Sequence, residues 1–362
     1  MMSWSVNEYL VKLLRIRQLI AREQIDYVLV TCQTNFLWLT GGRPYVNQAS
    51  EKACADLLIG QDKVYLVSNN IESNRLLTEE LAGLGIEVAC YDWWEEQGFD
   101  AIITGIVGGK KLLTDIQLGN RFSRLRWDLL EEEKFRYGQV GEAVANILEV
   151  IAFTIEPDMS ELAIAEMIKH QAIVAGVNPW ITLVAVDERA YQYRHPVPTG
   201  NKLKRYAMLC LTGQKYGLFV STTRLVHFGQ LPADLAKRHQ AVMAVDAGFI
   251  GSTVPGVSVS SIFTSAVQSY QKWGYPEEWK SHHQGGMIGY MSREFRALET
   301  TKVEVRAGQA YAWNPTIAGV KSEDTILVCG NQATIVSKCR RFPTTLVEYP
   351  GGVVVRPSIL VL

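Results

Sequence analysis

The order of strand-like and helix-like segments constrains the fold of this chain more than any other feature. Near the N-terminus, apolar runs of strand length such as "IDYVLVTC" (residues 25–32) alternate with helix-like segments such as "NQASEKACADLLI" (residues 47–59). This alternation predicts an α/β domain with a mostly parallel sheet. From about residue 129, long amphipathic segments come first and short β-rich stretches follow, which predicts an α+β domain. We therefore predict two domains, at residues 1–127 and 128–362.

Capping signals mark the start of two predicted helices, one in each domain. Ser5 and Glu8 fit a capping box that begins a helix over residues 6–24. Ser160 is expected to cap a second helix, which stops at Gly176.

The composition argues against several classes of protein. The 362 residues are 48% hydrophobic and 20% charged, with a formal net charge of −1. The chain therefore has no strong net positive charge that would attract nucleic acid or an anionic membrane. No apolar run approaches the roughly 20 residues that a membrane span needs. The six cysteines are scattered without a C-x-x-C pair, which favours free thiols and predicts a cytoplasmic location.

The stretch "SHHQGGMIGYMSRE" (residues 281–294) is typical of the wall of a site. It holds Gly285, Gly286 and Gly289, with two histidines before them and an Arg-Glu pair after them. Glycine in a strand-like run costs backbone entropy and packing. Two interpretations follow: the glycines satisfy the geometry of a sheet, or they enlarge a cavity for a ligand.

Five segments in order resemble those of a known family. They are "YRHPVPTGNKL", "LTGQKYGLFVSTTR", "GGMIGYMSRE", "RAGQAYAWNP" and "GVKSEDTILV". They resemble the substrate-site histidine segment, the metal-binding hairpin, the glycine-rich loop, the E-P-G segment and the closing strand of the pita-bread family. This family, M24, includes aminopeptidase P, prolidase, methionine aminopeptidase and creatinase. The resemblance implies a pita-bread fold for residues 128–362, a creatinase-type domain for residues 1–127, and a homodimer.

The same segments depart from the metal ligands that the resemblance implies. Working members hold two divalent metal ions with two Asp, one His and two Glu. The first four of these positions here hold Leu211 or Cys210, Ser221, Gly286 and Asn314, in that order. Only the last acidic ligand is present, as Glu323. Two divalent ions about 3.5–4 Å apart need several anionic oxygens, so we predict no dinuclear site and no cofactor.

Other metal arrangements and other ligands stay open at this stage. A rearranged single-metal site using His282 or His283 with Glu323 is the alternative to a metal-free site. The second histidine of the family's loop is replaced by Arg293. The candidates for substrate binding are Arg224, His282, His283, Arg293, Asn314 and Lys321.

Metal-free chemistry is implied by the resemblance to creatinase, in which a histidine acts as general acid and base. His195 lies in the matching segment, and Glu323 would orient the substrate; imidazole suits proton transfer near neutral pH. The alternative for His195 is a solvated loop residue, and the alternative for Arg224 is an ion pair with a structural carboxylate. Glu323 and Asp324 should face opposite sides of a strand, so only one of them can face the site, and the resemblance implies that it is Glu323.

Three functions are consistent with these residues, and whether the chain is an enzyme is left open. The first is a metal-independent hydrolase of a C–N bond in a small amidine, amide or Xaa-Pro-like substrate. The second is a catalytically silent homologue that binds a small molecule or short peptide. The third is a metal-dependent Xaa-Pro aminopeptidase or dipeptidase.

Overall fold

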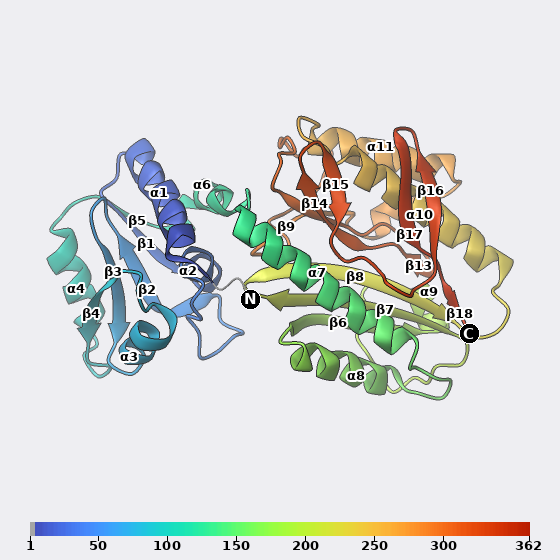
Figure 1. The fold of residues 1–362 in the computed structure, drawn as a ribbon, viewed down its shortest axis with the longest axis horizontal. Helices are drawn as coiled ribbons and strands as arrows, with labels where there is room; N and C mark the ends of the chain where they lie inside the picture. The colour runs from blue at the N-terminus through green and yellow to red at the C-terminus, as the bar shows by residue number, and fades with distance from the viewer. Residues whose placement is uncertain (1–3) are drawn as a thin grey trace. The chain divides into compact units, whose positions relative to one another are not determined.

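The chain divides into two compact units in the computed structural model, which describes residues 4–362. The division lies between Glu132 and Glu133; the sequence placed the end of the first domain at residue 127. Among residues 4–362, no helix is both long and apolar enough to cross a membrane. Each unit is described by itself below (Figure 1).

The first unit is built on one five-stranded sheet with the strand order β4-β3-β2-β1-β5. Its strands are β1 (Tyr27–Cys32), β2 (Lys52–Ile59), β3 (Val64–Asn69), β4 (Glu87–Tyr91) and β5 (Leu112–Thr114). Its helices are α1 (Val6–Glu23), α2 (Gln33–Thr40), α3 (Ser73–Arg75), the π-helix Leu76–Glu80, α4 (Gly98–Val107), α5 (Asp115–Leu118), α6 (Asn120–Ser123) and the 3-10 turn Arg124–Arg126. The predicted cap of α1 is confirmed, because the Glu8 amide donates to the Ser5 hydroxyl at 3.1 Å.

Two predictions for the first unit are wrong. Residues 47–59 do not form a helix, because Lys52–Ile59 is the central strand β2. The sheet is not mostly parallel, because β2 pairs antiparallel with both β1 and β3. The Gly60 amide donates to the Lys63 carbonyl at 2.9 Å, which closes a tight hairpin between β2 and β3. Alanine and leucine gave this strand a helix-like composition, but burial within the sheet outweighs that propensity.

The second unit contains two main sheets. One has the order β18-β8-β7-β6 and the other β10-β9-β11-β14-β15. The first comprises β6 (Asn178–Val186), β7 (Tyr206–Lys215), β8 (Leu218–His227) and β18 (Leu360–Val361). The second comprises β9 (Gly285–Ile288), β10 (Phe295–Arg296), β11 (Ala310–Trp313), β14 (Asp324–Cys329) and β15 (Gln332–Ile335). Two small hairpins pair β12 (Thr316–Ile317) with β13 (Val320–Lys321) and β16 (Thr344–Tyr349) with β17 (Gly352–Pro357).

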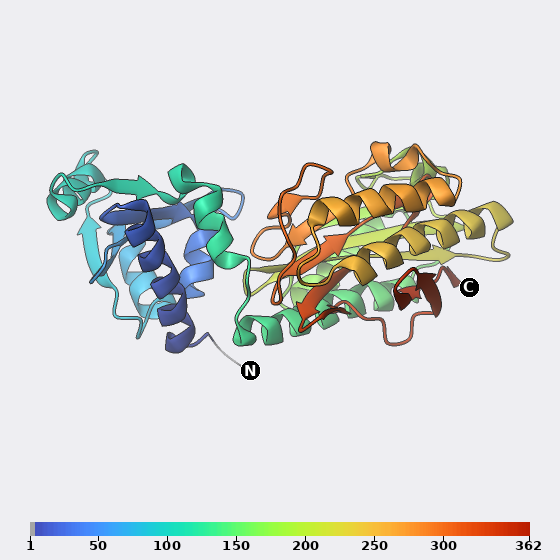
Figure 2. The same cartoon turned by 90° about the horizontal axis from the view of Figure 1, so that it is seen from above.

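Five α-helices and a 3-10 turn surround these sheets in the part of the second unit that the structure describes. They are α7 (Glu131–Ala152), α8 (Glu161–Val174), α9 (Glu188–Gln192), α10 (Ala233–Ser252), α11 (Val259–Lys272) and the turn Glu278–Ser281. The predicted Ser160 cap of α8 is confirmed by its bond from the Ala163 amide. The sequence did not predict α10 and α11, which lie side by side (Figure 2). The predicted combination of an α/β unit with an α+β unit is confirmed.

The two sheets of the second unit meet where β8 lies against the start of β14. The Thr223 amide donates to the Glu323 carbonyl at 3.1 Å. The Ser221 amide donates to the Thr325 hydroxyl at 2.9 Å, and that hydroxyl donates back to the Ser221 carbonyl. This junction brings together segments about a hundred residues apart, and the candidate site is built on it.

Candidate functional site

Glu323 lies at the junction of the two sheets and is buried. One carboxylate oxygen accepts a hydrogen bond from the Thr223 hydroxyl at 2.7 Å and lies 2.6 Å from the Lys321 ammonium. A guanidinium nitrogen of Arg293 lies 3.7 Å from the other oxygen. Burial alone would raise the pKa of Glu323, but Lys321 and Arg293 lower it below its usual value. Glu323 is therefore ionised, and the attraction raises the pKa of Lys321 despite burial.

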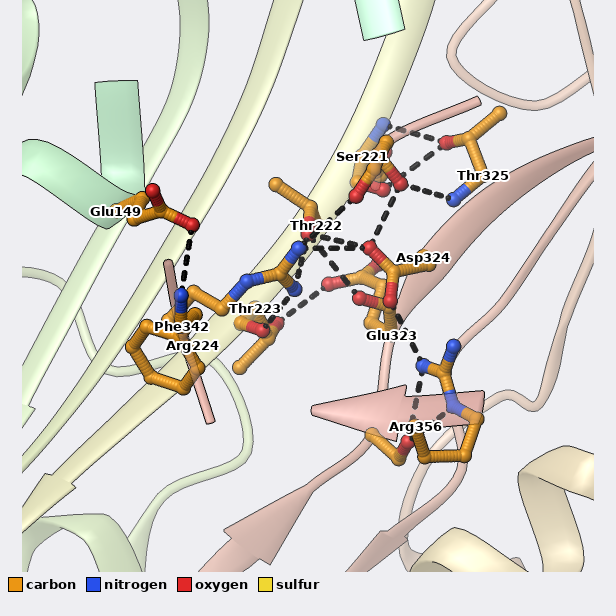
Figure 3. Close-up of polar contacts among 12 residues, drawn as sticks. Glu149, Ser221, Thr222, Thr223, Arg224, Glu323, Asp324, Thr325, Phe342 and Arg356 are labelled. Atoms are coloured by element: carbon orange, nitrogen blue, oxygen red, sulfur yellow. Dashed lines mark hydrogen bonds and ion pairs between the residues drawn. The ribbon is translucent and has the colours of Figure 1, made fainter. Parts of the chain in front are cut away.

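Asp324, the next residue, belongs to a different group of side chains (Figure 3). It pairs with Arg224 at 3.0 Å and with Arg356 at 2.9 Å. It also accepts hydrogen bonds from the hydroxyls of Thr222 at 2.9 Å and Ser337 at 2.7 Å. Burial opposes its ionisation, but the two arginines hold the pKa of Asp324 below its usual value.

Arg224 is therefore placed with Asp324 and not with Glu323. Its guanidinium donates to the Thr222 hydroxyl at 2.6 Å and to the Ser337 carbonyl at 3.0 Å. The side chain has no exposed surface. This placement corresponds to the structural ion pair that was the alternative for Arg224.

The strand pairing distinguishes between the two residues that could replace the family's first aspartate. Thr223 lies opposite Cys210 in the register of β7 and β8, and its hydroxyl, which donates to Glu323, lies 3.2 Å from the Cys210 sulfur. Because neighbouring side chains alternate along a strand, Leu211 faces the other way. Cys210 therefore occupies the side of the sheet that faces Glu323. Burial raises the pKa of its thiol, which keeps the thiol neutral near pH 7.

The other positions that the resemblance matches to metal ligands hold a neutral side chain or none. The Ser221 hydroxyl is hydrogen-bonded to Thr212 at 2.9 Å. The backbone N–H of Asn314 donates to the backbone carbonyl of Gln284 at 3.2 Å. The side-chain oxygen of Asn314 is buried and has no hydrogen-bond partner among residues 4–362.

Gly286 does not border an empty space, which corrects the expectation that it enlarges a cavity. Its φ is +150°, and a Cβ atom built on it would lie 2.3 Å from the Phe295 carbonyl oxygen. Gly285 has a φ of +97°, and its Cβ would lie 2.1 Å from the Ala312 carbonyl oxygen. The neighbouring strands β10 and β11 approach β9 too closely for side chains, so sheet geometry accounts for this glycine pair.

Three histidines form a second cluster in the same unit. The Nε2 atoms of His195 and His282 are 3.0 Å apart, at hydrogen-bond distance. The rings of His282 and His283 are stacked with centroids 4.5 Å apart. One potential ligand atom from each of the three lies within 4.8 Å of the others. His195 is exposed, His283 is partly buried and His282 is buried.

Burial and neighbouring cations keep the three imidazoles neutral. Burial, followed by Lys321, lowers the pKa of His282 to about 2. Burial, followed by Arg293, lowers the pKa of His283 to about 4. Burial and Lys321 also lower the pKa of His195, although Glu323 opposes them. A neutral imidazole can accept a proton or bind a metal ion.

The structure thus separates the predicted site residues, apart from Asn314, into three sets. His195, His282 and His283 form one cluster, Glu323, Lys321 and Arg293 form a second, and Arg224 belongs to the Asp324 network. The sequence did not indicate Arg296, which lies opposite Gly286 in the β9–β10 pairing and acts electrostatically on His195 and His283. Arg296 follows Arg293 by three residues, and this proximity to a predicted site residue could have indicated that it also lies near the site.

Comparison with known proteins identifies the family. The chain matches the model of metallopeptidase family M24 over residues 136–329, more than half of its length, and it belongs to this family. The predicted resemblance is confirmed. No curated protein sequence matches the chain at a significant level.

Solved structures with the same fold cover nearly the whole chain. A dipeptidase from Pyrococcus horikoshii OT3 is similar at 18% identity and a TM-score of 0.79, over 97% of this chain and all of that one. The prolidase of the same organism is also similar at 18% identity, with a TM-score of 0.76, over 91% of this chain and 99% of that one. The N-terminal domain of the FACT complex subunit SPT16 from Cicer arietinum is similar at 14% identity, with a TM-score of 0.72, over 93% of this chain and 97% of that one. At these identities the similarity shows the fold alone.

Proposed function

We propose that this M24 protein works without a dinuclear metal centre and binds a small molecule or short peptide that carries a carboxylate. The observation that carries the proposal is the 2.6 Å contact between Lys321 and Glu323. The one acidic residue retained from the ligand set is already neutralised by an ammonium of the same chain. The Thr223 hydroxyl also donates a hydrogen bond to the Glu323 carboxylate.

Electrostatics opposes a divalent ion at this position. Glu323 contributes one negative charge, whereas Lys321 and Arg293 contribute two positive charges, which leaves the group with a net charge of about +1. An incoming dication would have to displace the Lys321 ammonium, and breaking a buried ion pair costs about 3–5 kcal/mol. The same positive charge favours an anionic ligand, since Arg293 can meet a carboxylate through two donors.

A second candidate function is metal-independent hydrolysis of a C–N bond, as the resemblance to creatinase suggests. The hydrogen bond between His195 and His282 favours it. His195 is exposed and neutral, so its imidazole can take a proton from a water that attacks the carbon. The same proton can then pass to the leaving nitrogen as the C–N bond breaks.

The family's description as metallopeptidases and the name of a similar Xaa-Pro dipeptidase from Bacillus anthracis favour a metal-dependent Xaa-Pro peptidase, and the test below includes this alternative. The similar SPT16 domain is named as part of a complex subunit and not as a peptidase, which is compatible with the silent alternative. A homodimer and a cytoplasmic location remain predictions.

Metal content and peptidase activity test the proposal together. Wild type and Glu323→Gln, purified without chelator, would be analysed for bound metal and for Xaa-Pro cleavage with added Mn²⁺ or Co²⁺. We expect wild type and Glu323→Gln to have the same metal content, and neither to cleave Xaa-Pro substrates. Two ions per chain, lost together with cleavage in Glu323→Gln, would refute the proposal.

Ligand binding separates the first two functions. Carboxylate-bearing metabolites and their uncharged amide analogues would be compared by calorimetry with wild type and Arg293→Gln. We expect carboxylates to bind better to wild type, and the preference to fall in the variant. Turnover of a bound C–N compound that is lost in His195→Ala would favour the hydrolase, and turnover unchanged in that variant would exclude His195 as the acid and base.

A further inference from the structure

We propose that His195, His282 and His283 bind one divalent transition-metal ion of the Zn²⁺ class. This site is separate from the family's ligand positions, which hold Cys210, Ser221, Gly286, Asn314 and Glu323. None of the three histidines stands at one of those positions. The inference goes beyond the proposed function and does not require the bound ligand to be cleaved.

The spacing of the nitrogens suits a single ion. Zinc lies about 2.0–2.1 Å from histidine nitrogen, so two nitrogens in a tetrahedral site are about 3.4 Å apart. The Nε2 atoms of His195 and His282 are 3.0 Å apart, and the potential ligand atoms of all three residues lie within 4.8 Å of one another. Small rotations of the rings therefore bring the three nitrogens to ligand distance.

Hydrogen bonds around the cluster hold its two chain segments together. Arg194, next to His195, forms an ion pair with Glu278 of the 3-10 turn that leads to His282. Gln284 follows the two histidines, and its side-chain nitrogen donates to the His282 carbonyl at 2.6 Å. Its side-chain oxygen accepts from the Tyr270 hydroxyl at 2.9 Å. Such supporting contacts orient metal ligands and contribute to metal affinity.

The histidine rings also have nitrogens available for an ion. His282 is 7% exposed, and its Nδ1 is buried with no hydrogen-bond partner among residues 4–362. The Nδ1 atom of His283 accepts a long bond of 3.3 Å from the Gly285 amide. A buried polar atom without a partner costs free energy, and rearrangement of these rings around an ion would give the buried His282 nitrogen a partner.

The chemistry of the ligands selects the metal. Imidazole suits Zn²⁺, Co²⁺, Ni²⁺ and Cu²⁺, whereas Mg²⁺, Ca²⁺ and Mn²⁺ prefer oxygen ligands. Three imidazoles leave a fourth coordination position open. Lys321, Arg293 and Arg296 act electrostatically on these histidines, and they weaken binding of the bare cation. The same three cations favour an anion as the fourth ligand.

Titration with Co²⁺ tests the site directly, because nitrogen-bound tetrahedral Co²⁺ absorbs visible light. The full chain would be stripped of metal, dialysed and titrated with Co²⁺ alone, and Zn²⁺ would then be added to displace it. We expect one Co²⁺ per chain with a tetrahedral spectrum. Loss of a supporting contact typically costs 10–100-fold in metal affinity, so removal of a ligand should cost at least about 10-fold.

Three variants make the result specific to the cluster. His283→Gln should lose affinity, and His195→Gln should lose it too without a folding defect, because His195 is exposed. His170→Gln is the matched control, since His170 is an exposed histidine on α8. It should bind as wild type does. No tetrahedral spectrum, or equal affinity in His283→Gln and His170→Gln, would overturn the inference.

Glu323→Gln separates failure of this inference from failure of the proposed function. If the histidines hold the ion, Co²⁺ binding survives in Glu323→Gln. Binding that is lost in Glu323→Gln but kept in His283→Gln would place the ion at the family's acidic position. That outcome would contradict both proposals, whereas a complete absence of metal would contradict only the histidine site.

Discussion

Glu323 and Asp324 are consecutive buried carboxylates with very different surroundings. Asp324 faces two arginines and two hydroxyls in a fully buried network. Glu323 faces one lysine at 2.6 Å and, at 3.7 Å, an arginine whose side chain is 16% exposed. Asp324 therefore holds the sheets together, whereas the charges around Glu323 are only partly compensated and partly accessible. The difference shows that consecutive acidic residues of one motif can have separate partners, and it assigns the structural role to Asp324 and leaves Glu323 for the proposed binding role.

The largest expected effect comes from removing the charge of Asp324. Asp324→Asn leaves Arg224 and Arg356 buried beside a neutral amide, and an arginine cannot relieve this by losing its proton. We expect a loss of about 3–5 kcal/mol in the free energy of unfolding, measured with urea. Glu323→Gln should cost less, because Lys321 can lose its proton. Equal losses would remove the distinction between the two carboxylates.

The protein should also become less stable in acid because of His239, a buried histidine near Arg356, which is one of the two arginines paired with Asp324. Burial, with a smaller contribution from Arg356, lowers the pKa of His239 to about 3. The unfolded chain takes up this proton near pH 6.5, so the unfolded state is increasingly favoured as the pH falls from about 6.5 to about 3. We expect a fall of at most about 5 kcal/mol from this residue, at about 1.4 kcal/mol for each pKa unit between 6.5 and about 3.

Urea unfolding of wild type and His239→Gln at several pH values isolates this contribution. Other groups that titrate in the same window, such as Asp246, are common to both proteins. The difference in unfolding free energy between the two should therefore shrink or reverse toward acid. A difference that stays constant with pH would exclude His239 as the source.

The pairing on the Glu323 side can be measured by a double-mutant cycle. Lys321→Met and Glu323→Gln should each destabilise the fold, and the double variant should recover part of the loss. We expect a coupling of about 1–3 kcal/mol from urea unfolding. The Asp234–Arg238 pair on α10, whose side chains are 66% and 27% exposed, serves as the control and should couple by only about 0.3–0.5 kcal/mol. A coupling at Lys321 and Glu323 no larger than the control would weaken the argument against a metal.

The smallest expected losses of stability come from removing the hydroxyl of Thr222 or of its neighbour Thr223. Thr223 donates to Glu323, and Thr222 donates to Asp324 while accepting from Arg224. Thr223→Val should cost about 1 kcal/mol in unfolding free energy, whereas Thr222→Val should cost more, up to about 3 kcal/mol, because it leaves buried charges short of a partner. Thermal unfolding of the two variants tests this order. A larger loss of stability in Thr223→Val than in Thr222→Val would contradict it.

Most of the fold was predictable from the sequence where signals were local. Ser5 and Ser160 marked helix starts correctly, and the five motif segments placed the second unit in its family. The sequence misassigned β2, since its alanines and leucines resemble a helix until pairing with both neighbours is known. The helices at 233–252 and 259–272 were not predicted, although Ser258 caps the second of them.

Less of the candidate site was predictable. Strand alternation places Glu323 and Asp324 on opposite sides, and the structure gives them separate partners. The contact between His195 and His282 was not predictable, because these residues lie 87 positions apart and meet only through tertiary packing. The same is true of the pairing that sets Arg296 opposite Gly286.

The crowded backbone around Gly286 has an evolutionary consequence. A change of Gly286 alone to histidine, the residue that the resemblance implies at this position, would be strained because the first side-chain carbon would lie 2.3 Å from the Phe295 carbonyl oxygen. β10 would have to move before any side chain at position 286 became tolerable. A path to any new side chain at position 286 therefore requires a change in the position of β10 first, so it takes more than one substitution from this sequence.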